Sequence, residues 1–175
     1  LVGSEMCIRD SGNTVKGLNR DVTIRDIVST YIYPNTLKTL CVTRAQLKCA
    51  LERSAEYFAI DADGKLKVSE SFLTPIEQHF NYDYFSGIEA AFDIRRSVGD
   101  RVVSIKYKGE ELSGDKRLTL CMNNYRASGA GGYDIYRQCQ TVRELPTEIA
   151  ELIIAYVDKH RNITVDKHKW LKLIY

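Results

Sequence analysis

The segment TIRDIVSTYIYPNTLKTLCVTRAQLKCALERSAEYF, residues 23–58, decides the fold class of this chain. It opens with Thr23 and Asp26, whose three-residue spacing forms a capping-box pair. The apolar residues that follow recur at helical spacing, so the pattern predicts a short helix over about 24–30.

The second half of this segment predicts a strand and a longer helix. Pro34 stops the first helix, and the apolar residues of 37–42 are typical of a strand. Thr43 and Gln46 form a second capping pair, which opens a predicted helix over about 44–58. Helix, strand and helix therefore follow one another within 36 residues.

The remainder of the chain continues this mixture. Residues 61–84 begin with the turn Asp61-Ala62-Asp63-Gly64 and are otherwise polar with aromatic islands, so we expect a long surface excursion. Further strands are predicted at 87–94, 101–107, 116–122, 141–144 and 170–174, with a helix from Pro146 and Thr147 to about 159. The interleaved order predicts an α+β fold, a mixed or antiparallel sheet flanked by helices.

Composition excludes several classes of protein. The 175 residues suit one domain, and 44% hydrophobic residues argue against wholesale disorder. A net charge of +2 is too balanced for a surface that binds a nucleic-acid polymer. No apolar run approaches the roughly 20 residues of a bilayer-spanning helix, so we expect no membrane-spanning segment.

The first residues and the cysteines carry little structural signal. Residues 1–11, LVGSEMCIRDS, show no strand or helix pattern; we interpret them as a non-native, adapter-like segment outside the fold and take 12–175 as the domain. An odd number of cysteines without a CxxC pair predicts buried free thiols rather than a disulfide framework or zinc site. The five are Cys7, Cys41, Cys49, Cys121 and Cys139.

No set of residues with catalytic spacing is visible. His160 and His168 lie among lysines, which favours exposure to solvent. His79 lies in the long excursion, where a surface role is a simpler interpretation than contact with a ligand. Asp61 begins a calcium-loop-like run, but Phe72 stands where the loop requires Glu. The sequence therefore predicts no catalytic residue and no metal ligand in this chain.

Two aromatic and polar clusters are better candidates for binding. The loop NNYRASGAGGY, residues 123–133, follows a predicted strand but is neither a Walker loop nor GxGxxG. Its glycines permit positive φ, and Tyr125 and Tyr133 offer ring faces for stacking, so a tight turn and a binding loop both remain open. The second cluster, YIYPNT at 31–36, could hold a ring with tyrosine and amide groups.

Six ordered segments resemble the C-terminal domain of the 5′-nucleotidase superfamily. They are TIRDIVSTYIYPNTL, TRAQLKCALERSAEYF, NYDYFSGIEAAFDI, GDRVVSIKYKGEEL, MNNYRASGAGGY and ELPTEIAELIIAYVDKH. The resemblance as a whole runs in order from about Gly17 to Trp170. YPNTL, NYDYFSGI and NNYRASG are most similar to the bifunctional 2′,3′-cyclic-nucleotide 2′-phosphodiesterase/3′-nucleotidase branch.

The resemblance implies a division of labour. In that family a metallophosphoesterase domain, here absent and expected to be covalently linked in the full-length protein, holds two divalent metal ions and performs hydrolysis. The C-terminal domain clamps the base of a nucleotide between two aromatic rings and needs no cofactor of its own. The resemblance further implies a periplasmic, extracellular or cell-wall location.

Specific residues follow from the same resemblance. Tyr33 and Tyr125 match the two ring positions, and Asn35 matches an amide near the base. The implied substrate-binding set is Tyr33, Asn35, Asn124, Tyr125, Gly129, Gly131 and Gly132.

One departure separates the branches. Where the 5′-nucleotidase branch usually has GGDG, this chain has GAGG, and Asp134 is displaced from the acidic slot. The expected role is therefore recognition of 2′,3′-cyclic nucleotides and 3′-nucleotides. The alternatives are a 5′-nucleotidase or nucleotide-sugar hydrolase C-terminal domain, or a stand-alone nucleoside-binding module.

Overall fold

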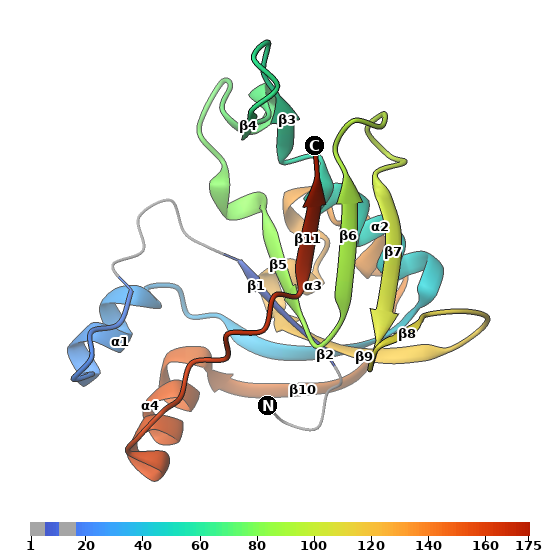
Figure 1. Cartoon of the computed structure of the whole chain (residues 1–175). Helices are drawn as coiled ribbons and strands as arrows, with labels where there is room; N and C mark the ends of the chain where they lie inside the picture. Colours follow the sequence, from blue (N-terminus) through green and yellow to red (C-terminus); the bar gives the residue numbers. More distant parts are fainter. Residues whose placement is uncertain (1–5, 11–16) are drawn as a thin grey trace.

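The computed structural model of the chain describes residues 6–10 and 17–175, and it contains two main sheets with helices around them (Figure 1). The five-stranded sheet has the order β10-β2-β9-β1-β5, and the four-stranded sheet has the order β11-β6-β7-β8. Both sheets contain parallel and antiparallel pairs. The α+β class with mixed sheets is confirmed.

The strands and helices have the following bounds. The five-stranded sheet contains β1 (Met6–Asp10), β2 (Thr36–Thr43), β5 (Asp83–Ser86), β9 (Arg117–Asn123) and β10 (Gln140–Glu148). The four-stranded sheet contains β6 (Glu89–Asp93), β7 (Val102–Tyr107), β8 (Glu110–Glu111) and β11 (Leu171–Ile174), and a separate hairpin contains β3 (Phe58–Ile60) and β4 (Leu66–Val68). The α-helices are α1 (Ile24–Thr30), α2 (Arg44–Ala55), α3 (Asn124–Ala127) and α4 (Ile149–His160), and the 3₁₀ turns are η1 (Glu70–Phe72), η2 (His79–Asn81), η3 (Ala130–Gly132) and η4 (Asp134–Gln138).

Both predicted capping boxes form and fix where α1 and α2 begin. The Asp26 N–H donates to Thr23 Oγ1 at 3.2 Å, and the Thr23 N–H donates to the Asp26 carboxylate at 2.8 Å. Thr43 and Gln46 exchange the equivalent bonds at the start of α2. Each box satisfies amide donors that would otherwise lack partners in the first turn, so local sequence determines these two starts.

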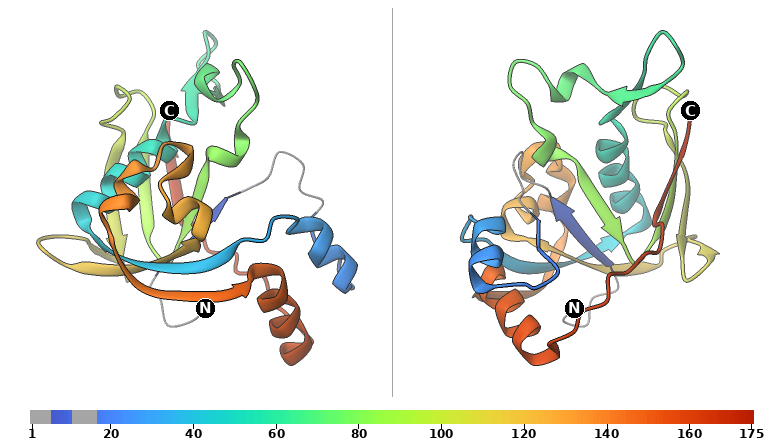
Figure 2. Two further views of the ribbon diagram at one scale, coloured as in Figure 1. Left: turned by 180° about the vertical axis from the view of Figure 1, so that it is seen from behind. Right: turned by 60° about the vertical axis from the view of Figure 1, so that its left-hand side comes forward.

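The core joins α2 to both sheets. Leu47 and Leu51 on α2 are almost fully buried, and the same core cluster includes Leu40 and Leu120 of the larger sheet and Phe92 of the smaller one. The views in Figure 2 show α2 against the inner face of the four-stranded sheet, while α1 and α4 lie outside, at the β10 side of the five-stranded sheet. The body of the domain is thus one core, with α1 and α4 as an appendage.

Several predicted boundaries were wrong. The helix predicted to 58 ends at Ala55, because the chain turns into the β3–β4 hairpin, which the sequence analysis had assigned to an irregular excursion. Its turn is as expected: Asp61 Oδ1 accepts the N–H groups of Asp63 and Lys65 at 2.9 and 2.8 Å. At the other end, α4 begins at Ile149 rather than at Pro146.

The strand β10 is longer than predicted and runs through Pro146. The register of its pairing with β2 shifts between Leu145 and Glu148. Pro146 lies within this shift, where no N–H is needed for the hydrogen bonds between the strands. Because β10 is also the edge of its sheet, a proline is tolerated there.

The start of the chain also differs from expectation. Met6–Asp10, which we had placed outside the fold, forms β1 between β9 and β5, and Met6 is 1% exposed in the core. The exclusion of these five residues from the fold was therefore wrong, because the backbone completes hydrogen bonding between two strands. The non-native origin of residues 1–11 stays a prediction, and the remainder of that segment lies outside the described residues.

The cysteine prediction holds in part. Cys41, Cys49, Cys121 and Cys139 are free, as expected, but only Cys121 is buried and Cys49 is exposed on α2. The side chain of Cys7 lies outside the described residues.

Candidate functional site

The two aromatic clusters singled out in the sequence lie where the interior strand β2 begins and the interior strand β9 ends, and this border of strand ends is called the β2–β9 edge. Strands β2 and β9 are antiparallel, with Leu37 opposite Asn123, so the start of β2 and the end of β9 lie together. Tyr33 comes just before β2 and Tyr125 just after β9. Asn124 Oδ1 accepts the Thr36 N–H at 3.1 Å and ties the two segments to each other.

Both candidate tyrosines are accessible. The exposed fraction is 66% for Tyr33 and 44% for Tyr125, so each ring can present a face to a ligand. Tyr33 lies in the loop between α1 and β2, whereas Tyr125 lies on the one-turn helix α3. This exposure distinguishes them from the tyrosines of the core, Tyr133 and Tyr136, which are 1% exposed.

Asn35 holds the Tyr33 loop through its backbone. Its N–H donates to the Tyr33 carbonyl at 2.7 Å, and its carbonyl accepts the Ile149 N–H at the start of α4 at 2.8 Å. Within the described residues, its side-chain amide makes no hydrogen bond. That amide is therefore free to meet a ligand at the same edge.

The glycine loop needs its glycines for backbone conformation. Gly129, Gly131 and Gly132 have φ values of +85°, +74° and +87°, which side chains other than glycine rarely adopt. A Cβ at Gly132 would lie 2.5 Å from Arg53 Nε, and one at Gly131 would overlap Arg126 Nη1 and Asn81 Oδ1. The crowding at these positions comes from side chains of the protein itself.

A buried network supports this loop from beneath. The Arg126 guanidinium pairs with the Asp83 carboxylate at 2.9 Å, with side-chain exposures of 1% and 0%. It also lies 4.5 Å over the ring of Tyr133. Ser54 Oγ and Tyr133 Oη are hydrogen-bonded at 2.8 Å, and burial raises the pKa of the Tyr133 hydroxyl.

Tyr133 is therefore not a stacking residue. The sequence analysis offered its ring as a second stacking face in the glycine loop, but its ring is covered by Arg126 on one side and by the parallel ring of Tyr136 at 5.7 Å. Arg126 and Asp83 were missed because they are 43 residues apart, and a single sequence carries no signal that pairs them. They do lie within two of the segments that carry the family resemblance.

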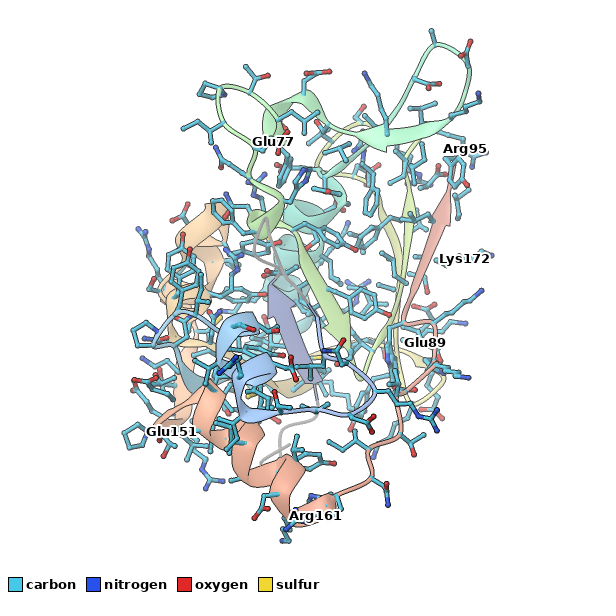
Figure 3. The ribbon with its side chains drawn as sticks, turned by 90° about the vertical axis from the view of Figure 1, so that its left-hand side faces the viewer. Glu77, Glu89, Arg95, Glu151, Arg161 and Lys172 are labelled. Atoms are coloured by element: carbon cyan, nitrogen blue, oxygen red, sulfur yellow. The ribbon has the colours of Figure 1, made fainter. Side chains whose placement is uncertain are left out.

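Other candidate positions do not join this edge. His79 Nδ1 and Tyr57 Oη are hydrogen-bonded at 2.8 Å, and the two rings are in edge contact within a cluster of aromatic side chains. Asp134 is at the surface and pairs with Arg137 at 3.3 Å. Figure 3 shows the excursion around Glu77 and the helix α4 around Glu151 and Arg161 at opposite ends of the molecule.

A cavity of about 250 Å³ lies elsewhere, between α2 and β7. Its cationic residues are already engaged: Arg44 Nε donates to the Leu112 carbonyl at 2.6 Å, Lys48 is 3.9 Å from Glu52, and Arg96 pairs with Asp100. This hollow therefore lacks the free groups expected of a ligand site.

The comparisons with known proteins agree with the fold. The model of the 5′-nucleotidase C-terminal domain family matches residues 3–138. The chain belongs to this family. The resemblance drawn from the sequence is confirmed at that level.

Relatives of known name are longer nucleotide-hydrolysing proteins. The trifunctional nucleotide phosphoesterase YfkN of Bacillus subtilis is 23% identical over 155 residues, which are 82% of this chain and 10% of that protein. The 2′,3′-cyclic-nucleotide 2′-phosphodiesterase/3′-nucleotidase of Haemophilus influenzae is 30% identical over 125 residues, 62% of this chain and 18% of that protein.

A solved structure is closely similar. It is a Staphylococcus aureus protein assigned as a 5′-nucleotidase and solved with α-ketoglutarate, with a TM-score of 0.91 and 34% identity. The match covers 98% of this chain and 34% of that protein. This 5′-nucleotidase-type domain thus spans between a tenth and about a third of the length of these relatives.

Across residues 6–10 and 17–175, no three side chains of His, Cys, Asp or Glu gather closely enough to hold a metal ion. None of the helices in the described part of the chain is long and apolar enough to cross a membrane.

Proposed function

We propose that this domain recognises the nucleoside part of a nucleotide by stacking its base between Tyr33 and Tyr125. The observation that carries the proposal is that the segments bearing these two exposed rings lie together where β2 begins and β9 ends, in a 5′-nucleotidase-type domain. Stacking on an aromatic ring stabilises a bound base by about 1–3 kcal/mol and tolerates every base, because each base has a π-face. Broad base specificity follows.

Polar groups at the same edge orient the base. The side-chain amide of Asn35 has both a donor and an acceptor for the edge of a base. Asn124 acts indirectly, because its side-chain oxygen is engaged by the Thr36 amide and holds the two loops together. The glycine loop supplies a backbone surface without side chains at Gly129, Gly131 and Gly132.

Hydrolysis is proposed to take place in a covalently linked metallophosphoesterase domain. The family resemblance assigns the two metal ions to that linked domain, so we propose no catalytic step for this chain. Its contribution is to hold the nucleoside so that the phosphate is presented in one position, which lowers the entropic cost of reaction. From the resemblance to the 5′-nucleotidase superfamily, we also propose a periplasmic or cell-surface location for the full-length protein.

The proposed substrates are nucleoside 2′,3′-cyclic phosphates and 3′-nucleotides. The named function of the Haemophilus influenzae relative and the absence of an acidic residue in the GAGG loop support this choice. A second candidate, a 5′-nucleotidase domain, is favoured by the similarity to the Staphylococcus aureus structure. Hydrolysis of 3′-AMP and 5′-AMP by the full-length protein separates the two, because both nucleotides share the nucleoside that this domain holds, and the first choice requires faster hydrolysis of 3′-AMP.

The clamp itself is tested by substitution. Tyr33→Ala and Tyr125→Ala should each weaken adenosine binding by about 1–3 kcal/mol, whereas Phe at either position should be nearly neutral. Tyr175→Ala is the matched control, because Tyr175 is 60% exposed but follows β11 in the other sheet. If both clamp variants bind adenosine like the unmodified chain, the proposal is wrong.

A further inference from the structure

Arg126 is a fully buried charged side chain next to a proposed ligand-binding residue. It is 1% exposed and directly follows Tyr125 on α3. Burial of a charge is costly unless that charge is paired and hydrogen-bonded. The contacts of the Arg126 guanidinium must therefore offset the cost of burying its charge.

The guanidinium contacts the glycine loop four residues away and two neighbouring elements, η2 and β5, that lie more than 40 residues earlier in the chain. Its Nε lies 3.0 Å from Asp83 Oδ1 on β5, its Nη2 donates to the Phe80 carbonyl in η2 at 2.8 Å, and its Nη1 donates to the Ala130 carbonyl in the glycine loop. The backbone N–H of the same residue donates to Asn123 Oδ1 at 2.6 Å, which caps α3. Arg126 thus fixes α3 to the sheet, to the excursion and to the loop.

The helix α3 depends on such contacts. It has four residues, and a single helical turn is unstable without tertiary packing because nucleation of a helix is unfavourable. The Arg126 Cζ also lies over the ring of Tyr125, 5.8 Å from its centroid, within the range of a cation–π contact. One side chain therefore controls both the backbone that carries Tyr125 and the surroundings of its ring.

We infer that Arg126, held by Asp83, is a positioning residue for nucleoside recognition that acts through Tyr125. This inference rests on the proposed stacking function. Arg126 is covered by protein and does not touch the ligand; it orients the Tyr125 ring and leaves a ring face available to the base. The same guanidinium fills the space that a side chain at position 131 would need, so its placement requires glycine there.

The first test is a double-mutant cycle in the 175-residue chain, with adenosine affinity measured by calorimetry. Arg126→Met keeps an unbranched, flexible stem but removes the guanidinium with its charge and donors, and it should weaken binding about 5- to 150-fold, the effect expected for loss of one stacked ring. In a Tyr125→Ala background the same substitution should change affinity less than twofold, because the residue through which it acts is gone. Additive losses would overturn the inference.

A matched control separates positioning from general destabilisation. Arg101 is also buried, and its Nη1 donates to the carbonyls of Ala55 and Phe58, away from α3. Arg101→Met should lower the melting temperature but leave adenosine affinity within twofold. If Arg101→Met weakens binding as much as Arg126→Met, Arg126 is merely structural.

A ligand-independent measurement covers the case in which Arg126→Met does not fold. Arg126→Lys keeps the charge but not the three-way geometry, and 3-fluorotyrosine placed at Tyr125 reports the ring environment by ¹⁹F NMR. The substitution should shift or broaden the Tyr125 signal, and an unchanged signal would overturn the positioning role. If Arg126→Lys shifts the signal but the unmodified chain does not bind adenosine, the proposed function is contradicted while the role of Arg126 in placing the ring is retained.

Discussion

Replacement of Gly131 by alanine tests the packing beneath the glycine loop. The residue has φ of +74°, and its new Cβ would overlap Arg126 Nη1 and Asn81 Oδ1. The left-handed conformation costs a non-glycine residue about 1–2 kcal/mol. Overlap with well-packed neighbours adds about 1–3 kcal/mol, so we expect a loss of about 2–5 kcal/mol in the free energy of unfolding.

Gly64→Ala is the matched control for this prediction. Gly64 has φ of +78°, almost the same as Gly131, but its Cβ would have no atom within 4 Å. It should therefore lose only the backbone term, about 1–2 kcal/mol. Urea unfolding followed by circular dichroism gives both values, and equal losses for the two alanine variants would refute the crowding by Arg126.

An acidic residue at position 131 should fare no better than alanine. Gly131→Asp would restore the acidic loop of the other branch of the family, yet it meets the same buried guanidinium and the same positive φ. We expect a destabilised chain without improved binding of 5′-AMP. A stable variant with clearly tighter 5′-AMP binding would show that the branch assignment is wrong.

Two further predictions concern activity and pH. The purified chain, incubated with 2′,3′-cyclic AMP and Mn²⁺, should release no 3′-AMP or phosphate above the buffer control, because hydrolysis is assigned to a linked domain; turnover that survives repurification would contradict a pure recognition role. The pKa of the Asp93 carboxyl is lowered from 3.8 to about 2, mainly by the hydrogen bond from the Arg95 side chain at 2.8 Å. A carboxyl whose pKa is lowered by folding stabilises the fold at pH values above its unfolded pKa, and it loses that contribution as the pH falls through the folded value. The acid-unfolding curves of the unmodified chain and Asp93→Asn should therefore converge between about pH 4 and 2. Curves that run parallel through this range would contradict the lowered pKa.

Local signals predicted the parts of the fold that local chemistry determines. The starts of α1 and α2 follow from the capping pairs at Thr23 and Thr43, whose bonds form within three residues. The turn at Asp61 is equally local. These features need no knowledge of distant segments.

Tertiary context determined what the sequence analysis missed. Strand β1 gains its structure from the neighbouring β9 and β5, so its own residues carry no clear pattern. Pro146 argued for a helix start, but the register skip in the β10–β2 ladder accommodates it within an edge strand. The burial of Tyr133 depends on Arg126 and Tyr136, which the glycine-loop sequence alone does not reveal.

The candidate site also combines features that the sequence predicts with features that only the tertiary structure determines. Strand order could not be read from the sequence, and the antiparallel β2–β9 pair brings together the segments that carry Tyr33 and Tyr125. The family resemblance supplied these two residues, and the fold supplies the reason why residues so far apart can act together. The supporting pair of Arg126 and Asp83 emerges only from the structure.

A crystal structure of the chain with adenosine tests the central claim most directly. The account predicts that the adenine ring lies between the rings of Tyr33 and Tyr125, in stacked contact with both, at the β2–β9 edge. Adenosine bound in the cavity between α2 and β7, or at the domain edge without contact to either tyrosine, would contradict it.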